Sequence, residues 1–149
     1  EDLCGNDVGR KLLILARELD LQNEFEEIAI QNLIPEHLRD GDKSGFLNRL
    51  QELDAIYAEI KQNQKPNHVL RYIGELSGDL QQDKGNLEVK LVSVPSDTAL
   101  GGLKGSDSFF EIYTESYGDR PIVIQGAGAG SAVTARGVFG DILRLSEKG

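Results

Sequence analysis

Apolar residues recur with a helical period in the first half of the chain and alternate in much of the second half. Residues Asp7–Leu19 are rich in helix formers and contain a continuous apolar block, Leu12–Ala16. This block predicts a helix that is buried on more than one face. We expect Asn6 or Asp7 to cap the helix. Gly9 lowers the helix propensity, which indicates that another part of the chain packs close to the backbone there.

Two further elements are expected before residue 63. The alternation within Glu26–Leu33 predicts a short strand, and Pro35 ends it. Apolar residues spaced three and four apart over Lys43–Gln62 predict one amphipathic surface helix. The polar residues 62–67 then form a loop.

Beyond this loop the hydrophobic period changes from 3.6 to 2. Residues His68–Leu76 and Leu87–Val94 predict two strands joined by a turn rich in glycine and aspartate. In the second strand, Leu87 and Val89 face one side, whereas Glu88 faces the other. One apolar face and one polar face are typical of antiparallel pairing.

The last part of the chain predicts a second pair of strands and a final helix. The strands are Phe109–Thr114 and Pro121–Gln125, and a glycine-rich segment leads from them into a helix over about Ser131–Ser146. The apolar positions of this helix form one stripe: Val138, Phe139, Ile142 and Leu145. Strands grouped between helices predict an α+β fold with a mixed, largely antiparallel sheet and helices packed on one face.

Composition narrows the class of protein. The chain has 149 residues, which predicts one domain, and a formal net charge of −9 with its basic residues spread out. This charge argues against nucleic acid or an anionic membrane surface as a partner. With Cys4 as the single cysteine and no signal peptide, we expect a cytoplasmic protein. His37 and His68 lack ligand spacing, so no metal site is expected.

Charged residues concentrate at the start of the chain. Asp7 and Lys11 are four residues apart and share one helix face. One interpretation is a surface ion pair worth roughly 0.2–0.5 kcal/mol, which spacing alone favours. The other is a lysine positioned as an acid or base, because Lys11 directly precedes the apolar block that predicts a buried helix.

Three glycines between the last strand and the last helix form a second candidate site. Gly126, Gly128 and Gly130 do not form the dinucleotide-binding fingerprint, because Ser131 or Val133 stands where its third glycine is needed. A tight turn is one interpretation of these glycines. The other is a ligand that approaches bare N–H groups at the helix N-terminus.

Five residues at the start of the chain form one spaced pattern: Asp2, Leu3, Gly5, Asp7 and Lys11. This pattern resembles the second half of the signature of the homoserine dehydrogenase family. The resemblance then continues through Val69–Gly74, Leu103–Asp107 and Ile124–Asp141. It covers essentially the whole chain and is loosest in the first amphipathic helix. The first part of the signature, a Glu-Pro-Asp-Pro-like run, is absent from this chain.

The resemblance implies reduction of L-aspartate 4-semialdehyde to L-homoserine with NADH or NADPH. Lys11 would donate a proton to the substrate carbonyl, and Asp2 and Asp7 would hold the substrate's amino end. Gly130, with Gly128, would lie near the nicotinamide of NAD or NADP. Residues 1–149 would then be the substrate-binding, catalytic and dimerisation domain, and a separate N-terminal domain would bind the dinucleotide.

The resemblance also implies a homodimer and, in some relatives, fusion to an aspartate kinase. A catalytically inert dimerisation or regulatory module of the same fold is the alternative function. We expect the isolated chain to be inactive without the nucleotide-binding domain. Residues 104–107 are expected to form only a structural turn, and Cys4 falls on a variable position of the signature.

Overall fold

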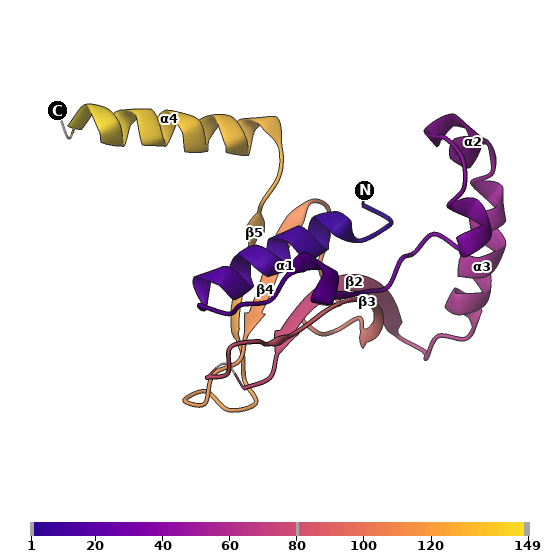
Figure 1. Cartoon of the computed structure of the whole chain (residues 1–149), viewed down its shortest axis with the longest axis horizontal. Helices are drawn as coiled ribbons and strands as arrows, with labels where there is room; N and C mark the ends of the chain where they lie inside the picture. The colour runs from indigo at the N-terminus through magenta and orange to yellow at the C-terminus, as the bar shows by residue number, and fades with distance from the viewer. Residues whose placement is uncertain (1, 80, 148–149) are drawn as a thin grey trace. The chain divides into compact units, whose positions relative to one another are not determined.

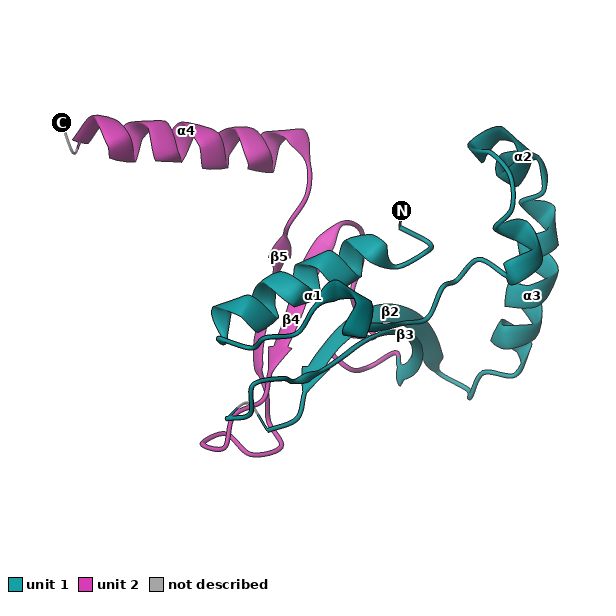
Figure 2. Ribbon diagram, viewed as in Figure 1, with its two compact units in different colours: residues 1–95 teal, residues 96–149 magenta. Residues whose placement is uncertain are grey.

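The computed structural model describes residues 2–79 and 81–147. The chain divides into two compact units, residues 1–95 and residues 96–149 (Figure 2), and each is described by itself. Within the described ranges, no helix is both long enough and apolar enough to cross a membrane. The assignment of residues 1–149 to one functional domain stays a prediction.

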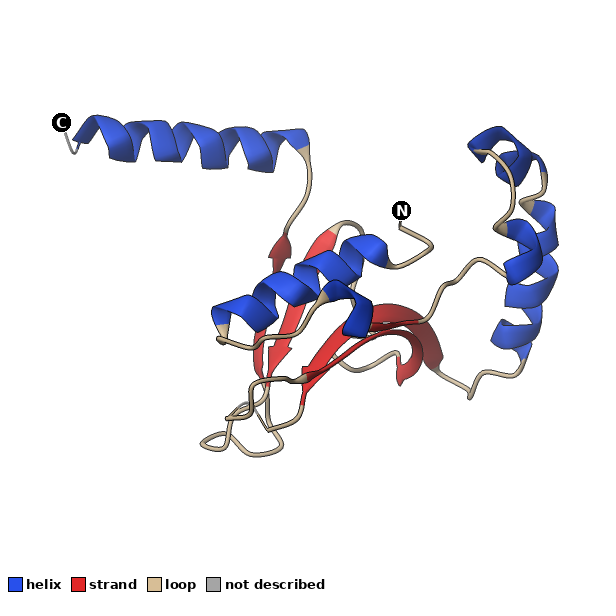
Figure 3. Cartoon of the chain, viewed as in Figure 1, coloured by secondary structure: helices blue, strands red, loops and turns tan. Residues whose placement is uncertain are grey.

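The first unit combines helices with a mixed sheet (Figures 1 and 3). Its helices and strands in chain order are α1 (Asn6–Glu18), β1 (Ala29–Ile30), α2 (Lys43–Asn48), α3 (Gln51–Gln62), β2 (His68–Ser77) and β3 (Asn86–Pro95). Short 3₁₀ helices lie at Phe25–Glu27 and Glu36–Leu38. The strand order is β1-β3-β2, with β1 parallel and β2 antiparallel to β3.

The β2–β3 pair confirms the prediction made from the alternating pattern. Its ladder runs from His68 opposite Pro95 to Ser77 opposite Asn86. Leu87 and Val89 are only 2% and 1% exposed. The intervening Glu88 instead pairs with Lys90, with 2.7 Å between Oε2 and Nζ. One face of the sheet therefore faces the core and the other carries charge.

Helix α1 covers the apolar face of this sheet. The buried core comprises Leu12, Ala16, Leu21, Ile28, Leu87 and Val89. A Cβ on Gly9 would lie 2.9 Å from Cδ1 of Ile30, which confirms the close approach expected at this glycine. The prediction that α1 is buried on more than one face is wrong, because Ile14 and Leu15 are 60% and 42% exposed. Only the face of α1 that carries Gly9, Leu12 and Ala16 is buried.

The predicted strand over residues 26–33 is wrong for most of its length. Residues Phe25–Glu27 form a 3₁₀ turn, which the Glu27 side chain stabilises by accepting a 2.8 Å hydrogen bond from the Glu24 N–H. This local capping competes with extended backbone. Only Ala29–Ile30 pairs with β3, opposite Glu88 and Val89.

The single helix predicted over residues 43–62 is in fact two helices, α2 and α3. Asp42 caps α2 by accepting a hydrogen bond from the Gly45 N–H at 2.8 Å. At its end, the N–H groups of Arg49 and Leu50 bind the carbonyls of Phe46 and Leu47, three residues earlier. These tighter bonds replace the regular helical pattern and end α2 before α3 begins.

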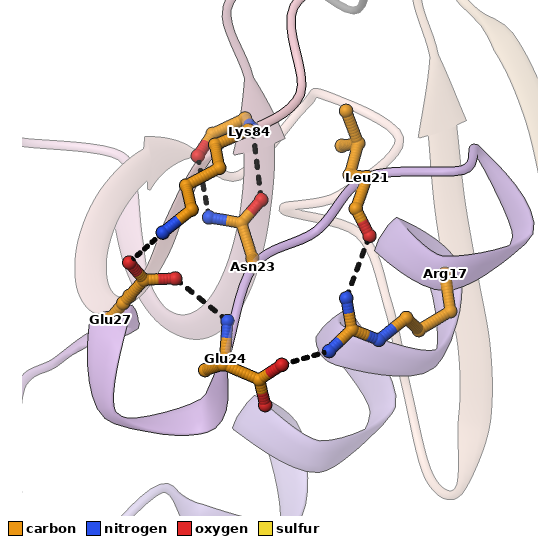
Figure 4. A network of polar contacts seen from close by, with 7 residues as sticks. Arg17, Leu21, Asn23, Glu24, Glu27 and Lys84 are labelled. Carbon is orange, nitrogen blue, oxygen red and sulfur yellow. Dashed lines mark hydrogen bonds and ion pairs between the residues drawn. The ribbon is translucent and has the colours of Figure 1, made fainter.

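A polar network fastens the segment that follows α1 (Figure 4). Arg17 donates to the Leu21 carbonyl and to the Glu24 carboxylate, both at 2.8 Å. The buried side chain of Asn23 pairs with the backbone of Gly85 through hydrogen bonds of 3.0 and 2.9 Å. Glu27 also forms an ion pair with Lys84. The network links the C-terminal end of α1 to the turn before β3 through side chains.

The second unit contains β4 (Asp107–Ile112), β5 (Ile122–Ala127) and α4 (Ser131–Glu147). The strands pair antiparallel from Asp107 opposite Ala127 to Ile112 opposite Ile122, and α4 follows the glycine segment as predicted. None of the residues of these three elements is buried, so the apolar stripe of α4 is exposed. The α+β class is confirmed, with the described strands arranged in two sheets instead of one.

Candidate functional site

The residues Asp2–Gly5, here called the signature turn, lead directly into α1. The Gly5 N–H binds the Asp2 carbonyl at 3.3 Å, and the Gly5 carbonyl accepts the first helical hydrogen bond from Gly9 at 2.9 Å. The N-cap of α1 is therefore Gly5, with no side-chain cap, and the predicted capping by Asn6 or Asp7 is wrong. Gly5 has φ +80°, a left-handed conformation that glycine adopts without strain.

The signature turn lies directly on two strands of the sheet. A Cβ on Gly5 would collide with the hydroxyl of Tyr72 on β2 and would lie 2.7 Å from Cγ2 of Ile30 on β1. The Tyr72 hydroxyl donates a 2.7 Å hydrogen bond to the Gln31 carbonyl. Burial raises the pKa of Tyr72 above its ordinary value of 10.0. Position 5 thus requires glycine both for its conformation and for this close contact.

A second fastening joins the signature turn to the residues after β1. The Leu33 N–H donates to the Leu3 carbonyl at 2.9 Å. The Leu33 carbonyl in turn accepts a 2.8 Å hydrogen bond from the hydroxyl of Tyr57 on α3. Residues 31–33, here called the strap, therefore connect the signature turn to both the sheet and α3.

Asp7 and Lys11 form the ion pair that their spacing predicts. Lys11 Nζ lies 2.7 Å from Asp7 Oδ2, and the two side chains are 72% and 38% exposed. The buried helix from which the acid–base interpretation of Lys11 was argued is not observed, because Lys11 lies on the uncovered side of α1. The hydrogen bond from Lys11 is the main reason that the pKa of Asp7 is lowered. Asp2, in the adjacent turn, is also exposed. A cation and two carboxylates thus stand at the accessible N-terminal end of α1.

Removing the lysine should release the pKa of Asp7. In Lys11→Met we expect this pKa to rise toward its ordinary value of 3.8, as measured by NMR titration of the carboxyl carbon. Because the pKa is lowered in the folded state, the pair stabilises the protein above pH 3.8 and loses this effect as the pH falls through the lower folded value. Lys61→Met, on α3, is the control. An unchanged Asp7 titration in Lys11→Met would contradict this assignment.

The glycine loop, residues Gly126–Gly130, joins β5 to α4 in the second unit. A Cβ on Gly128 would collide with the side chain of Ser108 on β4, which supports the tight-turn interpretation at that position. Gly130 has φ +124°, and no atom lies within 4 Å of where its Cβ would be. Its carbonyl accepts 3.1 Å hydrogen bonds from both the N–H and the hydroxyl of Thr134. The open space at Gly130, at the start of α4, fits the close approach of a ligand.

Two motifs of the family resemblance meet in the β4–β5 hairpin. Residues 104–107 are predicted to be a structural turn before a strand, and the turn at residues 105–106 is indeed followed by Asp107, which starts β4 and lies opposite Ala127. Its carboxylate accepts a 3.1 Å hydrogen bond from Gln125. The β4–β5 register therefore places this motif beside the glycine loop. Pairing the two predicted strands from the sequence would have revealed this proximity.

Tyr72 is a residue that the sequence reasoning missed. It belongs to the Val69–Gly74 motif, whose other end also touches α1: a Cβ on Gly74 would lie 3.1 Å from Cγ1 of Val8. The motif is thus the surface on which the signature turn and the first turns of α1 rest. The sequence signal that could have pointed to Tyr72 is that Val69–Gly74 is one of the motifs that resemble the family. Strand periodicity alone also explains the apolar residues of this motif.

Two depressions in the surface of the first unit have linings that do not include these charged residues. One of about 320 Å³ is lined partly by Ile60, Lys65 and His68. Another, of about 390 Å³, is lined partly by Gln31 and Lys90. Neither lining includes Asp2, Asp7 or Lys11. Because Asp2 and Lys11 are exposed and the Asp7 side chain is only partly covered, these residues lie on an accessible surface that another part of the protein would have to cover to enclose a substrate.

Known proteins and one family profile match this chain over nearly its whole length. The sequence profile described as homoserine dehydrogenase matches residues 1–143. A homoserine dehydrogenase of Emericella nidulans is 41% identical over 99% of this chain and 41% of that protein. A chloroplastic bifunctional aspartokinase/homoserine dehydrogenase of Zea mays is 38% identical over 98% of this chain and 16% of that protein.

A solved structure is also similar. The crystal structure of a Candida auris protein of unknown function superposes with a TM-score of 0.77 and 36% identity, covering 98% of this chain and 40% of that one. The chain thus spans less than half the length of these relatives. Because the family profile covers all but the last six residues, the resemblance seen in the motifs is confirmed. The chain belongs to the homoserine dehydrogenase family.

Proposed function

We propose that this chain is the substrate-binding and catalytic part of an enzyme that reduces L-aspartate 4-semialdehyde to L-homoserine. The observation that carries the proposal is the exposed Asp7–Lys11 pair beside Asp2, in a chain of this family. The inert-module alternative is disfavoured because all three charged residues of the signature are present. The names of the relatives, homoserine dehydrogenase and aspartokinase/homoserine dehydrogenase, also support the proposed reduction.

The chemistry follows from the charges at the start of α1. NADH or NADPH, when bound, supplies the hydride that the carbonyl carbon receives. The Lys11 ammonium donates a proton to the carbonyl oxygen, so the aldehyde becomes an alcohol. Asp2 and Asp7 bind the positively charged amino group of the substrate. Asp7 can accept hydrogen bonds from Lys11 and the substrate together, because a carboxylate has about four lone-pair sites.

The glycine loop is the proposed cofactor contact of this chain. Gly130, with its open side and its place at the start of α4, allows a nicotinamide ring to approach the backbone. Gly128 shapes the loop against Ser108. The dinucleotide would be held mainly by a separate domain, in agreement with the small share of each relative that this chain covers.

We further propose that two copies of the protein associate through this part of the chain. The support is the unburied apolar surface of the second unit, which includes Ile124 at 54% and Phe139 at 61% exposure. Analytical ultracentrifugation of the full-length protein tests the association, and a monomer at micromolar concentration would contradict it.

Fusion of this chain to an aspartate kinase is a further proposal, which the name of the Zea mays relative supports.

The test of the activity is turnover by the full-length protein that contains this chain. We expect oxidation of L-homoserine with NAD⁺ or NADP⁺, followed by the absorbance of the reduced cofactor. Residues 1–149 alone should be inactive. An inactive full-length protein would refute the proposed function, and an active isolated chain would refute the placement of the main cofactor contacts in another domain.

The direction of the proton transfer predicts a pH dependence. In the oxidation of homoserine, Lys11 must accept the hydroxyl proton, and only a neutral amine can do so. We therefore expect kcat/KM for oxidation by the full-length protein to rise from neutral to alkaline pH. The Lys11→Met variant should lose this rise together with most of its activity. A flat profile of the unaltered protein over this range would contradict the assigned role of Lys11.

A further inference from the structure

The Gln31 residue of the strap is held at three points. Its N–H donates to the Val89 carbonyl at 2.8 Å, and its side-chain oxygen accepts from the Leu91 N–H, also at 2.8 Å. Its carbonyl accepts the 2.7 Å hydrogen bond from Tyr72. Val89 and Leu91 belong to β3 and Tyr72 to β2, so Gln31 is fixed to both strands. This fixed residue lies two positions before Leu33, which binds the signature turn.

Tyr72 acts on the signature turn by two routes. Its hydroxyl fixes Gln31, and through the strap this sets the Leu33–Leu3 hydrogen bond of 2.9 Å. Its ring and hydroxyl also lie directly against Gly5, where they fill the space that a Cβ would need. Both routes end at Leu3 and Gly5, within the residues 2–5 that carry Asp2.

Helix α1 is also held by packing contacts of its own, besides its N-cap at Gly5. Gly9, Leu12 and Ala16 are buried against the sheet and the 3₁₀ turn, and they fix the helix that carries Lys11. Loss of the Tyr72 hydroxyl would therefore loosen the signature turn while the helix keeps its packing. The position of Asp2 should depend on Tyr72 far more than the position of Lys11 does.

We infer that Tyr72 is a positioning residue for substrate binding: through the strap and Gly5 it holds the signature turn so that Asp2 meets the substrate's amino group. This inference rests on the proposed function. It means that Tyr72, in the middle of β2, affects substrate affinity, whereas Lys11 carries out the proton transfer.

The test is Tyr72→Phe in the full-length protein, which removes the hydroxyl and keeps the ring. We expect KM for homoserine to rise about fivefold, the effect of losing one hydrogen bond, while kcat stays nearly constant. Tyr117→Phe is the matched control, because Tyr117 is 62% exposed in the second unit, and it should leave both constants unchanged. A fall of kcat with unchanged KM would overturn the inference, since it would place the effect on Lys11.

A second measurement does not depend on activity. Cys4 lies inside the signature turn and is partly buried, so its alkylation by iodoacetamide reports how firmly the turn is held. Mass spectrometry of the Cys4 peptide should show faster alkylation in Tyr72→Phe than in Tyr117→Phe. Equal alkylation rates would overturn the inference. If the unaltered protein oxidises no homoserine, the proposed function fails, and the alkylation rates still decide whether Tyr72 holds the turn.

Discussion

Replacing Lys11 by alanine in the full-length protein is expected to lower kcat by about 10²–10⁴-fold, the usual contribution of a positioned general acid. KM for homoserine should change far less, because Asp2 and Asp7 remain to bind the amino group. The helix should tolerate the change, since the Lys11 side chain is 72% exposed. Steady-state kinetics in both directions, with thermal unfolding as a check of folding, measure the effect.

Two further variants separate proton transfer from charge. Lys11→Arg keeps a cation beside Asp7, but its guanidinium does not give up a proton at ordinary pH. It should therefore be nearly as slow as the alanine variant. Lys61→Ala removes an exposed lysine from α3 and should leave kcat unchanged. Full activity in Lys11→Arg, or a loss in Lys11→Ala that lies entirely in KM, would show that Lys11 acts only through its charge.

Replacing Gly5 by alanine adds one methyl group to the signature turn and is expected to lower the free energy of unfolding strongly. The backbone at Gly5 has φ +80°, and the new Cβ would collide with the Tyr72 hydroxyl and lie 2.7 Å from Ile30. The left-handed conformation and the forced repacking together should cost about 2–5 kcal/mol of the free energy of unfolding. Urea denaturation of the full-length protein measures this cost.

Gly118→Ala is the matched control for the backbone conformation. Gly118 has φ +57°, and no atom lies within 4 Å of where its Cβ would be, so this variant should lose only about 1–2 kcal/mol. The double variant Gly5→Ala/Tyr72→Phe removes the colliding oxygen and should recover part of the lost stability. Equal losses in Gly5→Ala and Gly118→Ala would contradict the close contact between Gly5 and Tyr72.

The regular elements could be predicted from the sequence because each follows from a local period. The alternation after residue 67 marks both antiparallel pairs, and the helix propensity after Gly5 places α1 within one residue of its observed start. Alternation wrongly predicts a strand over residues 26–33, because the Glu24–Glu27 hydrogen bond favours a 3₁₀ turn over extended backbone. The break between α2 and α3 likewise depends on hydrogen bonds that no periodicity shows.

The site divides in the same way. The Asp7–Lys11 pair could be predicted because four residues make one helical turn. The exposure of Lys11 could not be predicted, because the apolar block after it suggests a helix that is covered on several sides. In the structure the sheet covers only one face of α1. The role of Tyr72 depends on contacts with Gly5 and Gln31, which come together only when β1 and β2 flank β3.

The shortness of β1 has a consequence for how the protein behaves at high concentration. Among the described residues of the first unit, a strand of two residues leaves most of the adjoining edge of the ten-residue β3 without a neighbouring strand on that side. Bare strand edges of this kind recruit strands from other molecules and begin aggregation. The side chain of Gln31 binds the Leu91 N–H just beyond the end of β1 and so occupies a donor that an incoming strand would need. One amide side chain thereby protects the edge where the backbone pairing stops.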